Sequence, residues 1–174
     1  MRLNLRFRRT SLAAGDNAMG FLEDLEKEQV KDLPLRDAIV INEHTIARAA
    51  IALMRSNDLG CSVIVQREWE PTGIFTEQSV IRMLHEGASL DSNPVSKFRD
   101  PSYRCVGLTD SIRTVWDAVV EEGMRFMCVV DHEGQLVGLA GQRSLADYVC
   151  DCYARQVAVQ RLGSKPWMLE REGA

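Results

Sequence analysis

The hydrophobic positions of the chain change their period in a set order. Residues 38–41 form a short apolar run with β-branched side chains, which is typical of a strand. Apolar residues then recur at helical spacing, namely Ile46, Ala49, Ala50, Leu53 and Met54. Apolar runs at 61–65 and 73–75 predict two further strands, and a second helical pattern extends to Leu84. The predicted order is strand, helix, strand, strand, helix.

The same order returns in the second half of the chain. A short run at 105–106 precedes a helical pattern made of Ile112, Val115, Trp116, Val119 and Val120. Runs at 127–131 and 136–140 follow, with a turn at Glu133-Gly134 between them and a helical pattern beyond Gly141. A repeat of this length is a supersecondary unit whose apolar face usually needs a second copy to cover it. We therefore expect two repeats that fold as one α+β (α/β) module.

Polar residues mark where the helices begin. Thr45 is the predicted N-cap of the first helix, and Thr76 is the predicted N-cap of the helix after the third strand. In the second repeat, Asp110 or Ser111 is expected to cap the first helix. Each prediction assumes that a side-chain oxygen accepts from a free N–H group at the helix start.

The two ends of the chain differ from this repeated middle. Residues 1–18 begin with an arginine-rich, acid-free stretch and are predicted to be a disordered basic tail, with a transit peptide or a start at Met19 as alternatives. Residues 19–33 place Phe21, Leu22 and Leu25 near helical spacing and predict an amphipathic helix that packs on the repeats or on a partner. Residues 154–174 are expected to form a C-terminal tail, in which Trp167 either docks or stays loose.

Composition narrows the possible functions. A net charge of −4 and a pI of about 5.4 argue against nucleic-acid binding. Charges interrupt every apolar run before it could span a bilayer, so no membrane insertion is expected. The five cysteines are odd in number and lack secretory context, which favours reduced thiols in the cytoplasm. Cys150 and Cys152 diverge on a helix, and the three histidines share no ligand spacing with other residues, so no metal site is predicted.

Several short motifs occur twice and in register. They include Gly73-Ile74-Phe75-Thr76, Cys128-Val129-Val130-Asp131 and the run from Gly134 to Gly138. Together they resemble a tandem pair of cystathionine-β-synthase (CBS) domains, known as a Bateman module, of the stand-alone bacterial type. The resemblance covers roughly Leu33 to Val149, with repeats expected at 34–90 and 91–153. It implies pseudo-two-fold packing, a homodimer, and a regulatory role without catalysis and without a required cofactor.

The resemblance also implies two ligand clefts, each built from both repeats. Ligand-binding members of the family carry the motif Gly-hydrophobic-hydrophobic-Thr-x-x-Asp. The threonine hydroxyl and the N–H groups at the helix start contact a phosphate, and the aspartate accepts hydrogen bonds from both ribose hydroxyls. Here the stretches 73–79 and 138–144 correspond, and Ser79 and Ser144 replace both aspartates. Loss of the charged acceptor weakens adenosine recognition by about 1–2 kcal/mol per hydrogen bond.

The favoured cleft is expected to contain a phosphate-binding hydroxyl, two arginines and an aromatic face; its residues are Thr76, Gln78, Ser79, Arg104, Met124, Arg125 and Phe126. The second and weaker cleft is expected to contain Ala38, Gly60, Cys61, Gly141, Arg143 and Ser144. An alternative is that Thr76 and Ser79 only cap a helix, that Arg125 pairs with Glu121 or Glu122, and that Phe126 is a core residue.

Two functional hypotheses follow. The first is a module that senses an adenosine-type ligand, such as AMP, ADP or ATP, and signals to an effector protein that the sequence does not identify. The alternative is a ligand-free dimerisation or protein-interaction module, which the two missing aspartates motivate. An enzyme is not expected, because no nucleophile–base pair, metal set or complete phosphate loop is evident.

Overall fold

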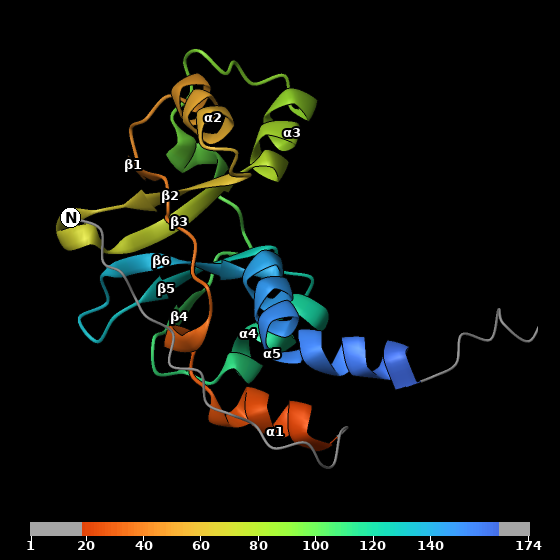
Figure 1. Ribbon diagram of the computed structural model, residues 1–174. Coiled ribbons are helices and arrows are strands. Elements are labelled where there is room, and N and C mark those ends of the chain that lie inside the picture. Colours follow the sequence, from red (N-terminus) through yellow and green to blue (C-terminus); the bar gives the residue numbers. More distant parts are fainter. Residues whose placement is uncertain (1–18, 164–174) are drawn as a thin grey trace, which may run out of the picture.

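The computed structural model describes residues 19–163, and side chains within 20–152 (Figure 1). The predicted tail at 1–18 and Trp167 lie outside the described residues. The first repeat contains β1 (Val40–Asn42), α2 (Ala47–Ser56), β2 (Cys61–Val65), β3 (Pro71–Thr76) and α3 (Glu77–His85). The second contains β4 (Cys105–Gly107), α4 (Ile112–Val120), β5 (Phe126–Val130), β6 (Leu136–Gly141) and α5 (Gln142–Gly163). The predicted order of elements is therefore confirmed in both repeats.

The two sheets have the same topology and register. In each, the first strand is parallel to the second, and the second is antiparallel to the third, in the orders β1-β2-β3 and β4-β5-β6. Thr76 pairs with Cys61 at one end of the first ribbon, and Gly141 pairs with Phe126 at the corresponding place in the second. Both ribbons also shift register near their far ends. The sequence repeat is thus a structural repeat.

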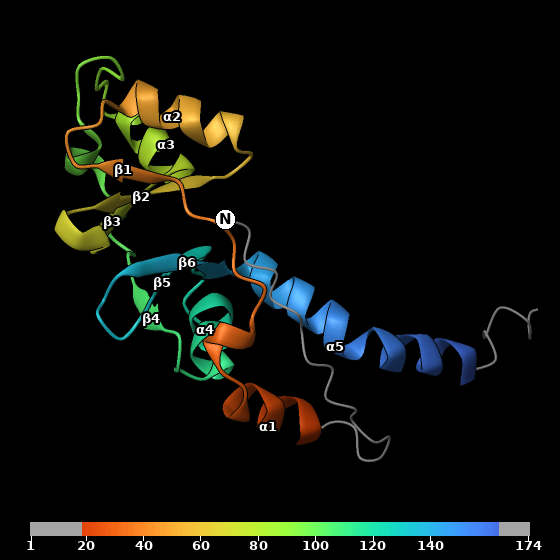
Figure 2. The ribbon, with the colours of Figure 1, turned by 60° about the vertical axis from the view of Figure 1, so that its left-hand side comes forward.

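The sheets face each other, and the helices cover their outer sides (Figures 1 and 2). A shared cluster fills the space between the sheets and consists of Leu59, Cys61, Val63, Ile74, Cys128 and Leu139. Helices α2 and α3 pack on the first sheet around Phe75 and Met83, while α4 and α5 pack on the second around Met127. Each sheet is buried on both faces, which explains why the second strand of each repeat is almost entirely apolar, with Ser62 as the polar exception.

The amphipathic N-terminal segment forms α1 (Met19–Lys27), which lies against α4. Leu25 is fully buried there, and the rings of Phe21 and Trp116 meet edge to face with centroids 5.1 Å apart. Trp116 of α4 therefore contacts α1 of the same chain. The long helix α5 extends away from the repeats (Figure 2). Among residues 19–163, no helix combines the length and apolarity needed to cross a bilayer.

The predicted cap of α2 is wrong, because main-chain groups from distant segments serve its first turn. Ile46 occupies the N-cap position, and no side chain caps the helix. The N–H groups of Ala47 and Arg48 instead donate to carbonyl oxygens of the inter-repeat linker at Asn93 and Leu90, both at 3.0 Å. The main-chain oxygen of Thr45 accepts a hydrogen bond from the N–H of Val95 at 2.9 Å.

Helix α4 is capped in the same way by the segment that precedes the first repeat. The N–H of Ile112 donates to the carbonyl oxygen of Glu28 at 2.9 Å, and Ser111 makes no side-chain cap. Asp110 closes a turn, since its carboxylate accepts from the N–H of Gly107 at 2.8 Å. Each repeat therefore receives its helix cap from the segment that leads into the other repeat, which fastens the two repeats together.

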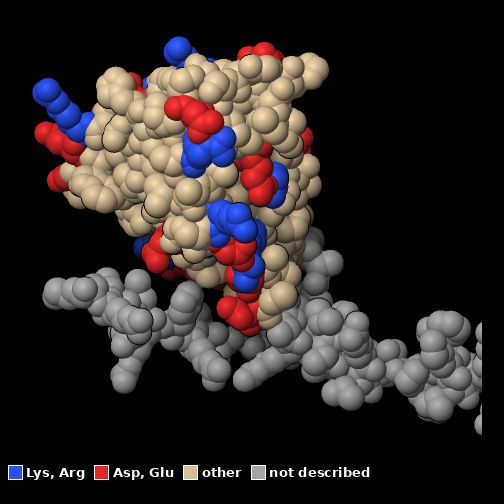
Figure 3. Space-filling model, turned by 90° about the horizontal axis from the view of Figure 1, so that it is seen from above, with Lys and Arg blue, Asp and Glu red and all other residues tan. Residues whose placement is uncertain are grey.

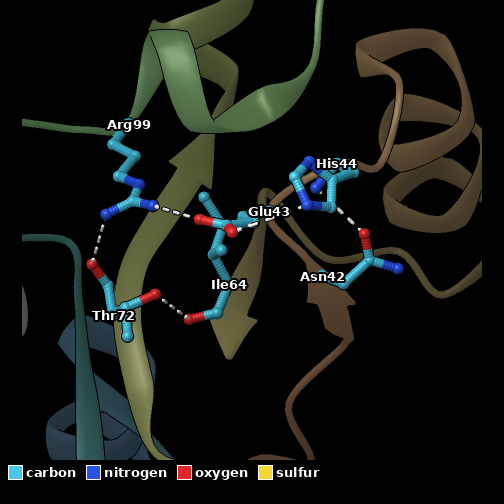
Figure 4. A network of polar contacts seen from close by, with 6 residues as sticks. All are labelled: Asn42, Glu43, His44, Ile64, Thr72 and Arg99. Carbon is cyan, nitrogen blue, oxygen red and sulfur yellow. Dashed lines mark hydrogen bonds and ion pairs between the residues drawn. The ribbon is translucent and has the colours of Figure 1, made fainter. Parts of the chain in front are cut away.

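Arg99 holds the linker against the first sheet (Figure 4). Its Nη1 donates to the carbonyl oxygen of Thr72 at 3.3 Å, and its Nη2 donates to Glu43 Oε2 at 3.4 Å. Arg82 of α3 donates to the Arg99 carbonyl at 2.7 Å. The linker thus enters the space between the repeats along a defined path, which positions the residues that follow it at one of the clefts described next.

Candidate ligand clefts

Two clefts open between the repeats at corresponding strand–helix junctions. The first, called here the Thr76 cleft, has a volume of about 570 Å³ and lies between the β3–α3 junction and the segment leading into β5. The second, called the Arg143 cleft, has a volume of about 810 Å³ and lies between the β6–α5 junction and the turn after α2. Both fall within the range of 300–1,000 Å³ typical of small-molecule sites.

The Thr76 cleft collects most of the residues predicted for it. Its lining includes Thr76, Gln78, Ser79, Met124, Arg125 and Phe126. Arg104 does not line the cleft, which corrects its expected place. Its guanidinium Nη1 donates to Glu122 Oε1 at 2.8 Å, while the adjacent Tyr103 lines the cleft. Neighbouring side chains of an extended segment point to opposite sides, so Tyr103 and Arg104 cannot both face it.

The hydroxyl of Thr76 already has two partners. Its Oγ1 accepts from the N–H of Ser79 at 3.2 Å, and it donates to Asp100 Oδ2 at 2.9 Å. Ser79 Oγ lies 3.3 Å from the Thr76 N–H, which completes a capping box, so the predicted cap of α3 is confirmed. The carboxylate of Asp100 therefore lies where the resemblance would put a phosphate, and like charges oppose binding of a phosphate there.

Sequence reasoning missed Asp100, Ser102 and Tyr103, all of which line the Thr76 cleft. They belong to the linker directly before β4. Their proximity to Arg104 was an available signal, because the start of the second repeat's first strand was already expected at this cleft. Across the whole cleft, Arg82, Arg125 and His85 face the two carboxylates of Asp100 and Glu122.

Arg125 lies between the clefts and lines both of them. Its Nη1 is 3.3 Å from Glu77 Oε2, so pairing with Glu121 or Glu122 is not what the structure shows. The guanidinium carbon also lies 5.4 Å from the centroid of the Phe126 ring. Both partners of the ion pair are more than half exposed, at 60% and 57%, so the pair is weak and its arginine is available to a ligand anion.

The Arg143 cleft contains four of its predicted residues, Gly60, Gly141, Arg143 and Ser144. Ala38 and Cys61 do not line it, contrary to expectation. Cys61 is fully buried between the two sheets, and Ala38 packs against the same cluster. The burial of Cys61 also raises the pKa of its thiol to about 12, so it stays protonated at neutral pH.

Arginines dominate the charge of the Arg143 cleft. Arg36, Arg55, Arg125 and Arg143 line it, together with the carboxylates of Asp58 and Glu77. Arg36 and Arg55 were missed, because neither lies in a repeated motif. Arg36 Nη2 donates to the main-chain oxygen of Asp58 at 3.4 Å and so uses no carboxylate. Apolar walls complete the cleft and are formed by Ile51, Met54, Val80, Ile81, Phe126 and Leu139.

The missing hydroxyl of the second repeat has a steric cause. A Cβ atom on Gly141 would lie 2.2 Å from the main-chain oxygen of Arg125. In the first repeat the paired strand leaves room for the side chain of Thr76, whereas β5 approaches β6 too closely at Gly141. The positive groups that remain at the Arg143 cleft are therefore its arginines and the N–H groups at the start of α5.

The repeated fold agrees with a comparison against known families. A profile of the CBS domain matches residues 30–86 and again 95–151. The chain belongs to the CBS domain family. It carries two CBS domains in tandem, and the profile matches account for the sheets and the helices on both sides of them.

Several known proteins are similar to this chain at low sequence identity. An uncharacterized 17.7 kDa protein of Acidianus ambivalens is 27% identical to this chain over 112 residues. The match covers 64% of this chain and 66% of that protein, so the chain spans just under two thirds of this relative. A CBS domain protein of Pyrobaculum aerophilum, PAE2072, solved with AMP, matches with a TM-score of 0.63 and 20% identity over 79% of this chain and all of that one. The CBS domain pair of MJ0100, solved with 5′-methylthioadenosine and S-adenosyl-L-methionine, matches with a TM-score of 0.61 and 14% identity over 70% of this chain and 94% of that one.

The described part of this CBS pair holds no cluster of three or more histidine, cysteine or acidic residues that could bind a metal ion. Its cysteines are all free thiols, with Cys61 and Cys128 buried and Cys105, Cys150 and Cys152 exposed.

Proposed function

We propose that this CBS pair is a non-catalytic regulatory module that binds an adenosine-type ligand between its repeats and signals its occupancy to a partner protein. Two relatives of the same fold were solved with AMP or with adenosine-containing sulfur compounds. No catalytic family is indicated by the comparisons. The two clefts described above supply places of suitable size in this chain.

The single observation that carries the proposal is the concentration of arginines in the Arg143 cleft. Four arginines and two carboxylates line it, whereas the Thr76 cleft offers two arginines and a histidine against two carboxylates. A phosphate is attracted by the first arrangement and finds Asp100 opposed to it in the second. We therefore assign a phosphorylated nucleotide to the Arg143 cleft, although the motifs alone favoured the Thr76 cleft.

The apolar wall of the Arg143 cleft suits the adenine ring. Ile51 and Met54 of α2, Val80 of α3 and Leu139 of β6 contribute to this wall. Phe126 adds an aromatic face near the arginine shared by the clefts. Base, sugar and phosphate would then contact both repeats, so that binding would stabilise their relative positions.

A second copy of the chain is the partner proposed for the face formed by α2 and α3. Leu53, Ile81 and Leu84 are exposed on these helices at 41%, 56% and 61%. Figure 3 views this side, where acidic and basic side chains lie next to one another within a largely uncharged surface. Such a surface is compatible with a dimer and lacks the single-sign basic patch that nucleic acid would require.

Calorimetry tests the ligand proposal directly, with AMP, ADP, ATP and S-adenosylmethionine titrated into the full chain. We expect at least one of the phosphorylated ligands to bind, and Arg143→Gln to weaken it by roughly 10- to 100-fold, the value of a charged hydrogen bond. Arg48→Gln is the matched control, because Arg48 is exposed, pairs with Asp91 and lines neither cleft.

Thr76→Val separates the two clefts. It should leave nucleotide affinity unchanged if the ligand occupies the Arg143 cleft, and it should reduce affinity if the ligand occupies the Thr76 cleft. If none of the four ligands binds, the result contradicts the sensing function and favours the ligand-free interaction module. In that case, replacing Arg143 should leave association between copies untouched.

A further inference from the structure

Two cysteines lie side by side in the second sheet. Cys105 of β4 and Cys128 of β5 are direct register partners in a parallel pair of strands. Register partners on neighbouring strands present their side chains on the same face of the sheet. Cys105 is exposed and Cys128 is fully buried beneath it. The two side chains are close enough for each to shift the pKa of the other.

Tyr103 adds a third group to this pair. Its hydroxyl oxygen lies 2.9 Å from Cys105 Sγ and also contacts the main-chain oxygen of Pro71 at the start of β3. Burial and the contact with Cys105 raise the pKa of Tyr103, so its hydroxyl stays neutral. The O–H donates to the Pro71 oxygen, so the phenol oxygen is the group that meets Cys105 Sγ.

The surroundings make the two thiols chemically different. The neighbouring Cys128 thiol lowers the pKa of Cys105 to about 6, while partial burial and the nearby charge of Glu70 oppose the change. The neighbouring Cys105, burial and the proximity of Cys61 raise the pKa of Cys128. Cys105 is therefore the more acidic of the two thiols.

We propose that Cys105 and Cys128 form a hydroperoxide-reactive pair, in which Cys105 is oxidised first and Cys128 then closes a reversible disulfide. The Cys105 thiolate attacks the terminal oxygen of the hydroperoxide, the O–O bond breaks, and the alkoxide or hydroxide leaves and takes up a proton. Cys105 becomes a sulfenic acid. The sulfur of Cys128 then attacks that of Cys105, the S–O bond breaks, and water leaves with the Cys128 proton. The two thiols lose two electrons in total, and the hydroperoxide is reduced to an alcohol or water.

Strand geometry makes this disulfide a reversible one. Neighbouring strands lie about 4.8 Å apart, near the short end of the Cα separations that a disulfide spans. Closing the bond must draw the two Cβ atoms together against the hydrogen bonds of the ladder. Strained, accessible disulfides are the more easily reduced kind, and they serve regulation rather than stability.

The other cysteines lack this arrangement. Cys61 is fully buried and its pKa is raised to about 12, so it offers no thiolate. Cys150 and Cys152 lie on α5 two residues apart, and side chains at that spacing point away from each other on a helix. Oxidation is therefore expected to select the pair in the sheet. Because Tyr103 lines the Thr76 cleft, oxidation also breaks a contact made by a cleft residue.

Peptide mapping tests the proposal on the full, reduced chain. The protein is treated with one equivalent of hydrogen peroxide, blocked with N-ethylmaleimide, digested with trypsin and analysed by mass spectrometry. Tryptic cleavage puts Cys105 in peptide 105–113, Cys128 in 126–143, Cys61 in 56–67 and the helical pair in 144–155. The expected product joins 105–113 to 126–143, is lighter than their sum by two hydrogens, and separates with dithiothreitol.

Variants establish the order of events. Cys128→Ser should leave a Cys105 sulfenic acid that dimedone traps, and Cys105→Ser should protect Cys128 from oxidation. The double variant Cys150→Ser and Cys152→Ser is the control and should retain the cross-link. At pH 6 iodoacetamide should alkylate Cys105 about tenfold faster than a free cysteine peptide, since its larger thiolate fraction outweighs its lower nucleophilicity.

The peptide map of the unmodified chain does not depend on any variant folding. A disulfide confined to 144–155, a cross-link only between two chains, or alkylation of Cys105 no faster than the free peptide would each overturn the proposal.

Discussion

Replacing Gly141 with alanine is the sharpest test of why the second repeat lacks a hydroxyl at its strand–helix junction. The new Cβ atom would lie 2.2 Å from the main-chain oxygen of Arg125, whereas ordinary contacts begin near 3.4 Å. The obstacle is backbone and cannot rotate away as a side chain would. Strands β5 and β6 must therefore separate where Phe126 pairs with Gly141.

The cost can be worked from this displacement. Forcing extra volume into a packed site costs about 1–3 kcal/mol when neighbouring atoms must shift. A shift of about 1 Å in a hydrogen-bonded backbone belongs at the upper end, so we expect about 2–3 kcal/mol. For a chain of this length that lowers the melting temperature by roughly 4–12 °C.

Thermal unfolding followed by circular dichroism measures this change. Gly20→Ala is the matched control, because a Cβ atom on Gly20 in α1 meets nothing within 4 Å and the residue is helical. That variant should be neutral or stabilised by up to about 1 kcal/mol. Equal melting temperatures for Gly141→Ala and the parent would refute the argument that strand approach excludes a side chain at this position.

Three further predictions concern a helix cap, a ring contact and a partly buried carboxyl group. Thr76→Val should lower the free energy of unfolding by about 1–2 kcal/mol in urea titrations, because the Thr76 side chain caps α3. Thr45→Val should lower it by less than about 0.5 kcal/mol, because the Thr45 side chain caps no helix. Equal decreases for the two variants would contradict this assignment. Phe21→Ala should release α1 from α4 and raise the rate of amide hydrogen exchange in α1 by at least tenfold, without changing exchange in β2. An unchanged exchange rate in α1 would show that the ring contact does not hold α1 in place. Burial raises the pKa of Glu28 above 4.5, so stability from its protonated form is lost as pH rises through the folded-state pKa. Glu28→Gln should then be more stable than the parent at pH 7 but not at pH 4, and a gain of the same size at both values would contradict the titration.

Some parts of the site could be foreseen because their cause is local. The capping box at Thr76 depends on residues three apart in sequence, so its hydrogen bonds follow once a helix begins there. The burial of Cys61 and Cys128 followed from their places in apolar strands. Other parts had no local cause. Asp100 reaches Thr76 from the linker, and Glu77 reaches Arg125 from the other repeat.

The helix caps illustrate the same division. Thr45 has the right side chain at the right place, yet the carbonyl oxygens of Asn93 and Leu90 occupy the first turn of α2. A propensity for capping is a preference of about 1 kcal/mol, and a neighbouring segment that brings two main-chain acceptors outweighs it. No pattern within the first repeat contains that information.

Hydrophobic periodicity, read along the chain, was enough to predict the repeated unit, because the period of buried positions is a property of each strand and helix alone. The family was indicated by a resemblance of short motifs that occur twice in register. The chemistry of the clefts arose only when distant segments met. Folding placed Asp100 against Thr76, gathered Arg36, Arg55 and Arg143 around one cleft, and pressed β5 against Gly141. Charge balance and free volume depend on which groups become neighbours, and that is decided by packing between the repeats.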